Sequence, residues 1–153
     1  MERSFVMIKP DAVQRKLVGE ILSRFEKKGI KIVGMKLMKI TKDLATMHYA
    51  EHEGKSFFDE LIEFITSGPV VAMVMEGENI VEIIRRIVGA TMPTEALTGT
   101  IRGTYVLDTG HNVIHASDSK ESSKREIKLF FNEDELIDYQ LVAGKWVYSS
   151  LKY

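Results

Sequence analysis

The segment HNVIHASDSKESSKREI, residues 111–127, contains the side chains of this sequence that are best suited to catalysis. His115 ends a short apolar run, and a neutral imidazole is a competent nucleophile near pH 7 without activation by another base. Glu126 lies on the helix predicted to follow, where its carboxylate could bind one ring nitrogen and leave the other free. The pair indicates nucleophilic catalysis. The alternative is that His115 is a hydrogen-bonded structural histidine.

Three cations elsewhere in the chain point to phosphate. Lys9 ends a predicted strand, Arg85 lies on a predicted helix, and Arg102 lies in a long loop rich in threonine and glycine. If they converge, they would hold phosphates by charge-assisted hydrogen bonds and stabilise charge on a transferring phosphoryl group. For each cation alone, the alternative is a solvated surface role.

Two other patterns match known motifs poorly. The segment GIKIVGMKL spaces its glycines as a P-loop does, but Met35 stands at the lysine position, so we predict a strand. HYAEH places His48 and His52 one helical turn apart, as in a zinc protease, but Tyr49 occupies the position of the base. A surface helix is the favoured interpretation of HYAEH, with a metal pair as the alternative.

Length and composition limit the function classes. With 153 residues, 44% of them hydrophobic, the chain is expected to form one domain over residues 1–153. Its 21 basic and 22 acidic residues give a net charge of −1, so nucleic acid is not an expected partner. It has no cysteine, which excludes thiolate catalysis and disulfides. The start lacks a signal-peptide pattern, and the apolar run PVVAMVM is too short to span a bilayer, so we expect a cytoplasmic protein without a membrane partner.

Hydrophobic periodicity predicts alternating strands and helices. We expect strands at 4–8, 30–38 with a bulge at Gly34, 69–75, 104–108 and 112–115; helices at 20–29, 41–52, 57–67, 79–88 and 123–131; a long loop at 90–105; and an irregular C-terminal segment at 141–153. Thr41 is a predicted N-cap, and Asp118 with Glu121 is a predicted capping box. The order favours an α+β, ferredoxin-like βαββαβ sandwich over a doubly wound sheet. Its antiparallel four-stranded sheet would carry an extra helical hairpin and a C-terminal segment.

The sequence resembles the nucleoside diphosphate kinases from residue 5 almost to the C-terminus. The similar segments, in the order of the family, are FVMIKPDAVQR, HYAEH, FFDELIEFITSGPVVAMV, IRRIVGATMP, GTIRG and NVIHASDS. NVIHASDS is similar to the active-site signature in which a histidine carries phosphate. The resemblance implies transfer of the γ-phosphate of a nucleoside triphosphate to a nucleoside diphosphate, in ping-pong order. The alternative is a non-catalytic, ferredoxin-like regulatory module that binds nucleotides.

The resemblance also implies roles for individual residues. It makes His115 the phosphate acceptor, with Glu126 orienting its ring and Ser117 and Tyr49 supporting it. Lys9 is implied in both catalysis and binding. The residues implied to contact the nucleotide are Lys9 and Asn112 at the sugar and phosphate end, Phe57 on the base, Leu61 beside it, and Arg85, Thr91 and Arg102 on the phosphates.

The same resemblance implies a cofactor and an assembly. Mg²⁺ would be bound mainly by the nucleotide phosphates and water, without protein ligands for the metal. Family members are oligomers, and we expect a homohexamer, with a tetramer as the alternative. Met92, Thr98 and Thr104 depart from the family pattern, and all three lie in the loop that family members use at subunit interfaces.

Overall fold

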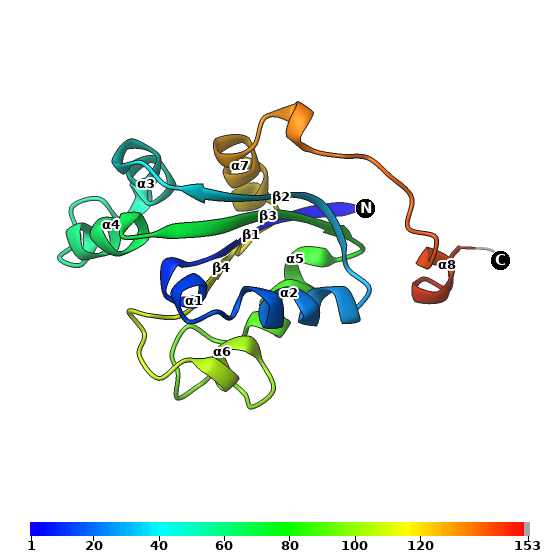
Figure 1. The fold of residues 1–153 in the computed structure, drawn as a ribbon, viewed down its shortest axis with the longest axis horizontal. Coiled ribbons are helices and arrows are strands. Elements are labelled where there is room, and N and C mark those ends of the chain that lie inside the picture. The colour runs from blue at the N-terminus through cyan, green and yellow to red at the C-terminus, as the bar shows by residue number, and fades with distance from the viewer. Residues whose placement is uncertain (152–153) are drawn as a thin grey trace.

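The computed structural model describes residues 1–151, and its centre is a four-stranded sheet in the order β2-β3-β1-β4 (Figure 1). The strands are β1 (Glu2–Ile8), β2 (Lys31–Lys39), β3 (Pro69–Gly77) and β4 (Ile114–Ala116). Neighbouring strands are antiparallel throughout. Together with the helices between them, this order confirms the predicted ferredoxin-like α+β fold.

Helices cover both faces of the sheet (Figure 1). They are α1 (Pro10–Gln14), α2 (Val18–Lys27), α3 (Lys42–His48), η1 (Ala50–His52), α4 (Phe58–Thr66), α5 (Ile80–Val88), α6 (Ile101–Tyr105), α7 (Lys120–Phe130), η2 (Glu133–Glu135) and α8 (Gly144–Val147). The helices α2 and α5 pack on one face, whereas α7 and the hairpin of α3 and α4 pack on the other. The predicted extra hairpin is therefore present.

Strand β1 contributes to both cores. Its side chains alternate between the faces, so Val6 and Ile8 pack with α2 and α5, while Phe5 and Met7 pack with α3, α4 and α7. All four are fully buried. The neighbouring strand β4 runs antiparallel to β1 and places His115 opposite Met7. The catalytic candidate thus lies on the edge strand β4, next to the buried strand β1.

Two local predictions are confirmed. The register of β2 against β3 shifts between Ile32 and Gly34, as the predicted bulge requires. The Thr41 side chain accepts a hydrogen bond from the Leu44 backbone nitrogen at 3.2 Å and caps α3.

The strand predicted at 104–108 is wrong. Residues up to Tyr105 belong to helix α6, which is capped by Thr100 accepting a hydrogen bond from the Gly103 nitrogen at 2.9 Å. After the buried Val106 the chain is exposed from Leu107 to His111, and Leu107 is 99% exposed. The β-branched residues of the segment suggested a strand, but the N-cap threonine and the tertiary contacts of Ile101 favour a helical turn.

Two helix starts also differ from the predictions. Pro10 occupies the first turn of α1, where its missing N–H has no cost, so residues 10–14, for which no helix was predicted, are helical. Helix α7 is capped by Ser119, whose hydroxyl accepts from the Ser122 nitrogen at 3.1 Å, and not by the predicted box of Asp118 and Glu121.

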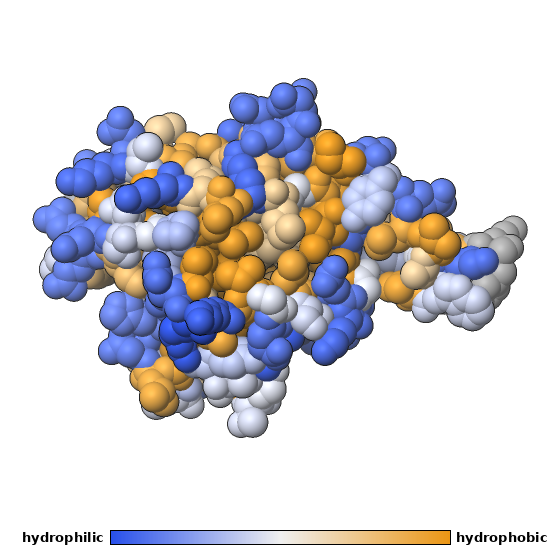
Figure 2. All heavy atoms as spheres, viewed as in Figure 1, coloured by the Kyte–Doolittle hydropathy of each residue, from blue (hydrophilic) through white to orange (hydrophobic). Residues whose placement is uncertain are grey.

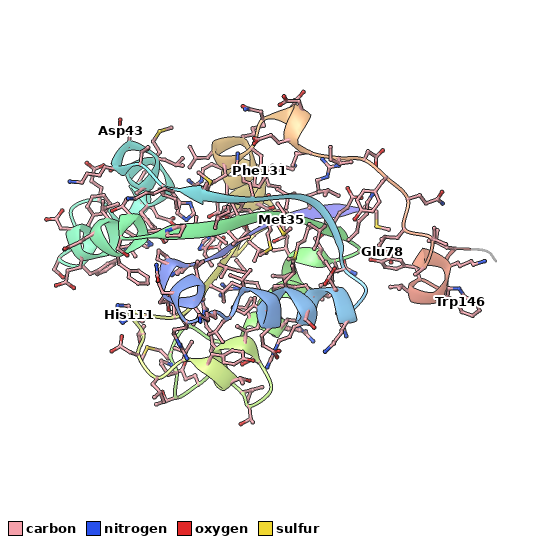
Figure 3. The ribbon with its side chains drawn as sticks, in the orientation of Figure 1. Met35, Asp43, Glu78, His111, Phe131 and Trp146 are labelled. Carbon is pink, nitrogen blue, oxygen red and sulfur yellow. The ribbon has the colours of Figure 1, made fainter. Side chains whose placement is uncertain are left out.

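The C-terminal segment runs back along the sheet. The Ile137 nitrogen donates to the Val33 carbonyl at 2.7 Å, and the Tyr139 hydroxyl donates to the Ile32 carbonyl at 2.8 Å. The prediction of an irregular segment is wrong for α8, from which Trp146 projects at one end of the molecule (Figure 3). Residues 152–153 of that segment lie outside the described residues.

Candidate active site

A cavity of about 830 Å³ opens beside the C-terminal end of β1 and brings most of the predicted site together. Its lining includes Lys9, Tyr49, Phe57, Leu61, Arg85, Thr91, Arg102, Asn112, His115 and Glu126. Of the predicted site residues, Ser117 is absent from the lining because it is fully buried behind Glu126. Residues from five separate stretches of chain therefore meet at one place.

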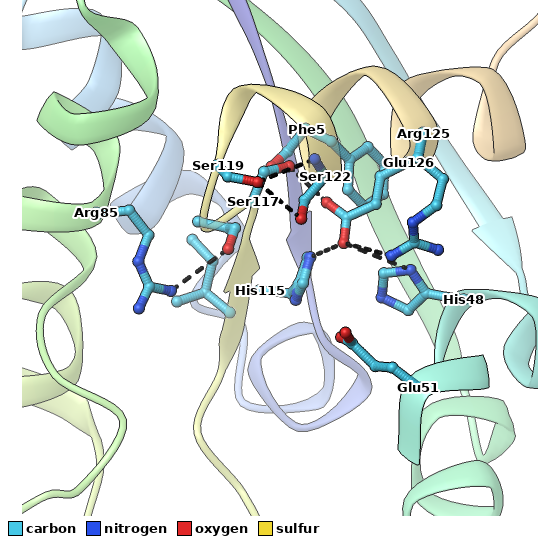
Figure 4. Close-up of polar contacts among 12 residues, drawn as sticks. Phe5, His48, Glu51, Arg85, His115, Ser117, Ser119, Ser122, Arg125 and Glu126 are labelled. Atoms are coloured by element: carbon cyan, nitrogen blue, oxygen red, sulfur yellow. Dashed lines mark hydrogen bonds and ion pairs between the residues drawn. The ribbon is translucent and has the colours of Figure 1, made fainter. Parts of the chain in front are cut away.

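The carboxylate of Glu126 holds both His115 and Ser117. Its Oε1 lies 3.0 Å from Nε2 of His115, and its Oε2 accepts a hydrogen bond of 2.5 Å from the Ser117 hydroxyl (Figure 4). The Glu126 side chain is 5% exposed, whereas that of His115 is 22% exposed. An ionised carboxylate accepts hydrogen bonds, so it favours the tautomer with the proton on Nε2. In that tautomer Nδ1 carries the lone pair.

A strained turn fixes the residues that precede β4. Val113 has φ 62°, a left-handed conformation that a β-branched residue rarely adopts. Its nitrogen donates to Oδ2 of Asp11 at 3.1 Å, and its carbonyl accepts from the Lys9 nitrogen at 2.9 Å. These bonds hold the turn in its strained conformation, and the turn places Asn112 and His115 at the cavity. Sequence reasoning missed Asp11, although an aspartate directly after Lys9-Pro10 was a usable signal.

Lys9 is a buried cation at the end of β1. Its Nζ donates to Oδ1 of Asn112 at 2.8 Å, and the residue is 7% exposed. Burial, together with the nearby charge of Arg102, lowers the pKa of Lys9 to about 8, and Asp11 opposes this effect only in part. A bound anion would relieve the cost of keeping this ammonium charged.

Arg102 is buried on the other side of the turn. Its guanidinium donates to the backbone carbonyls of Ile114 at 2.7 Å, Gly89 at 3.2 Å and Asn112 at 3.4 Å. Burial and the charge of Arg85 lower its pKa to about 10. Arg102 therefore braces the turn as well as facing the cavity. Arg85 makes one long contact of this kind, to the Ala116 carbonyl at 3.4 Å.

His48 belongs to this site, although the sequence pattern favoured a position on a surface helix. It is buried, at 3% exposure, and both ring nitrogens lack a hydrogen-bond partner. Burial lowers its pKa to about 2, so the ring is neutral. It lies between Tyr49, with ring centroids 4.5 Å apart, and His115, at 4.7 Å. Tyr49 thus packs on His48, which in turn contacts the candidate nucleophile.

The nucleotide end of the cavity is apolar and more exposed. Phe57 directly precedes α4 and is 47% exposed, while Leu61 is half-buried one turn later. An exposed phenyl face at a cavity mouth suits stacking on a planar base. Thr91, from the loop after α5, lines the same cavity.

The three departures from the family pattern lie away from the histidine. Met92 and Thr98 are exposed in the loop after α5, and Sδ of Met92 lies 3.8 Å from the Thr109 hydroxyl. The Thr104 hydroxyl donates to the Thr100 carbonyl at 2.8 Å within α6. None of these contacts involves His115.

The fold and the cavity together define a phosphoryl-transfer enzyme. A family profile described as "Nucleoside diphosphate kinase" matches residues 2–136. Curated proteins named nucleoside diphosphate kinase from Carboxydothermus hydrogenoformans and Methanobrevibacter smithii are 60% and 61% identical over 148 residues, which are 97% of this chain and 99% of each relative. The chain therefore belongs to the nucleoside diphosphate kinase family and transfers phosphate from nucleoside triphosphates to nucleoside diphosphates.

Solved structures agree with this assignment. The structure of a halophilic nucleoside diphosphate kinase from Halobacterium salinarum in complex with CDP has a TM-score of 0.94 and 55% identity, and it covers 96% of this chain and 98% of that one. A family protein from Babesia bovis has the same TM-score at 44% identity, with 97% of this chain and 100% of that chain covered. Among residues 1–151, we find no helix with the length and apolar character to cross a membrane.

Proposed function

We propose that His115 is the residue that carries phosphate between the two nucleotides. In the first half-reaction, Nδ1 attacks the γ-phosphorus of a nucleoside triphosphate, the bond to the bridging oxygen breaks, and the nucleoside diphosphate leaves. In the second, a terminal oxygen of another diphosphate attacks the phosphohistidine, and the imidazole leaves. The observation that carries this proposal is the bond of 3.0 Å between Nε2 of His115 and Glu126, which leaves Nδ1 unprotonated.

The three cations would stabilise the transferring group. Lys9 and Arg102 are buried, and Arg85 lies at the same cavity, so little water competes with their charge. The rigid bracing of Arg102 by backbone carbonyls keeps its position fixed during the reaction. Ser117 would hold the second oxygen of Glu126 and thereby fix the carboxylate. Tyr49 would support His115 through the ring of His48.

The nucleotide would lie across the same cavity. Phe57 would stack on the base with Leu61 beside it, and Asn112 and Lys9 would bind the sugar and the phosphate end. Thr91 would join the arginines at the phosphates. Since every base has a π-face, stacking gives little discrimination, and the enzyme is expected to accept many nucleotides. The relative from Halobacterium salinarum was solved with CDP, which supports a pyrimidine nucleotide in this place.

Magnesium would enter with the nucleotide. Mg²⁺ prefers oxygen ligands and keeps several waters. The carboxylates of Glu51 and Asp118 lie on the cavity wall, where they could bind those waters. Within residues 1–151, a group of three metal-ligating side chains occurs only at His48, His115 and Glu126, and its imidazoles do not suit Mg²⁺. The ion would neutralise charge on the β- and γ-phosphates.

We further propose that residues 1–153 form one domain that assembles as a homohexamer in the cytoplasm, with a tetramer as the alternative. The edge strand β2 supports assembly, because Met35 and Leu37 are 53% and 69% exposed on it. Met35 lies at the middle of the face shown in Figure 3, where Figure 2 shows a band of apolar side chains. Size-exclusion chromatography with light scattering would separate the two assemblies. The cysteine-free composition supports a reducing compartment.

The ping-pong order is tested by steady-state kinetics with both nucleotides varied. Double-reciprocal plots are expected to be parallel, because the first product leaves before the second substrate binds. Intersecting lines would mean that both nucleotides bind together, without a phosphoenzyme. His115→Asn is expected to reduce turnover to background while nucleotide binding persists.

A further inference from the structure

Three side chains with metal-binding atoms meet behind the nucleophile. The ligating atoms of His48, His115 and Glu126 all lie within 4.8 Å of one another. Oε1 of Glu126 is 3.0 Å from Nε2 of His115 and 3.9 Å from Nδ1 of His48 (Figure 4). Two imidazoles and one carboxylate form a ligand set typical of zinc sites and unsuited to Mg²⁺.

His48 makes this cluster more than a chance grouping. The residue is 97% buried, with both nitrogens lacking a hydrogen-bond partner, although a buried polar group without a partner is costly. Its ring is enclosed by Phe5, with centroids 6.1 Å apart, and by Phe130, at 5.2 Å. A metal ion bound by one of its nitrogens would satisfy a group that the protein alone leaves unsatisfied.

We infer that His48, His115 and Glu126 bind a zinc ion, and that this ion inhibits phosphoryl transfer by occupying Nε2 of the phosphate-accepting histidine. The donor atoms of a tetrahedral zinc site lie roughly 3.3 Å apart, so side-chain shifts of up to about 1.5 Å bring the cluster, whose ligating atoms lie within 4.8 Å of one another, to that geometry. The fourth position would face the cavity, where His115 is 22% exposed, and would hold water. Arg125, 3.8 Å from the same carboxylate oxygen and 47% exposed, would turn outward.

Inhibition follows from the number of ring protons. A neutral imidazole has one N–H, and in the free protein it lies on Nε2 and bonds to Glu126. When zinc takes the lone pair of Nε2, the proton moves to Nδ1, which then has no lone pair with which to attack phosphorus. No proton is lost or gained on the ring. This second part of the inference rests on the proposed role of His115, whereas zinc binding itself does not.

Calorimetric titration of metal-free, nucleotide-free protein with zinc chloride tests the binding. We expect one zinc per chain. His48→Phe replaces the ring without removing any hydrogen bond and should weaken zinc binding by at least about tenfold. The matched control, His52→Phe, changes another histidine of the same cavity wall, outside the cluster, and should bind zinc as the parent does. Equal affinity of the parent and His48→Phe, or a loss in His52→Phe alone, would overturn the site. Circular dichroism checks folding, and His48→Gln replaces the phenylalanine variant if that one unfolds.

The inhibitory mechanism has its own readout. Long-range ¹H–¹⁵N NMR of the histidine rings should report the proton of His115 on Nε2 without metal and on Nδ1 with zinc. The rate at which a nucleoside triphosphate phosphorylates His115 should fall as zinc is added. For each variant, this rate is compared with the rate of the same variant without zinc. Zinc bound through His48 without a change of tautomer or of labelling would contradict the inhibitory part. If the tautomer changes while phosphate transfer continues, the nucleophile is another residue, and the failure belongs to the proposed function.

Discussion

Oε1 of Glu126 lies 3.0 Å from Nε2 of His115, and in the proposed mechanism this contact selects Nδ1 as the nucleophilic nitrogen. Glu126→Gln would place an amide there that can donate to Nε2 and favour the opposite tautomer. We expect phosphohistidine formation to slow by about 100-fold or more, as measured by single-turnover labelling.

Ser117→Ala provides the matched control for this contact. It removes the bond to the other oxygen of Glu126 but keeps the carboxylate beside His115, so the loss in rate should be about tenfold or less. A larger effect of Ser117→Ala than of Glu126→Gln would mean that the carboxylate does not set the tautomer.

Lys9 should make nucleotide binding sensitive to alkaline pH. Burial lowers its pKa to about 8 in the free protein, and a bound phosphate would raise that pKa again. Affinity should therefore be full below pH 8 and fall as the pH rises above it, because the free lysine loses its proton. Calorimetric titration with ADP at several pH values measures this. Lys9→Gln should bind more weakly and lack this pH dependence; if the dependence persists, another group causes it.

Arg102→Ala should affect stability and activity together. The substitution removes donors from three backbone carbonyls, two of which flank the strained turn at Val113, and should lower the free energy of unfolding by about 3 kcal/mol. Arg85→Ala removes one long hydrogen bond, so it should lower the free energy of unfolding by well under half of that amount. Urea unfolding measures both. If Arg102→Ala slows phosphoryl transfer but leaves the free energy of unfolding unchanged, the hydrogen bonds to the backbone carbonyls contribute little to stability.

Phe57→Ala should weaken the binding of all nucleotides to a similar extent. Loss of a stacking face of this kind costs about 1–3 kcal/mol, so KM should rise by roughly tenfold with little change in kcat. Purine and pyrimidine diphosphates should be compared in parallel. A loss confined to one base would instead indicate recognition of base edges.

Elements with strong periodicity were predictable from the sequence, and the family resemblance implied many of the residues that line the cavity. The apolar run of β1, the Gly34 bulge and the Thr41 cap follow local rules, and the structure has all three. Helix α6 was missed because its five residues carry no helical stripe, and its formation depends on burying Ile101 in the core.

The position of His48 could not be predicted for a different reason. Its spacing to His52 suggests a shared helical face, but α3 ends at His48 and the chain continues as the short helix η1. This break turns His48 inward against His115 and leaves His52 on the cavity wall. A contact between residues so distant in sequence depends on how the hairpin packs on the sheet, which local patterns do not encode.

Phosphate is proposed to pass through His115, and the most direct test is to find which residue of the enzyme carries the phosphate. The protein should be incubated with γ-labelled ATP and magnesium without an acceptor, kept alkaline because phosphohistidine is labile to acid, and mapped by peptide mass spectrometry. We predict one phosphate on His115, on Nδ1, which leaves completely when GDP is added. Phosphate on another residue, or folded protein that binds ATP and turns over substrate without retaining label, would contradict the mechanism.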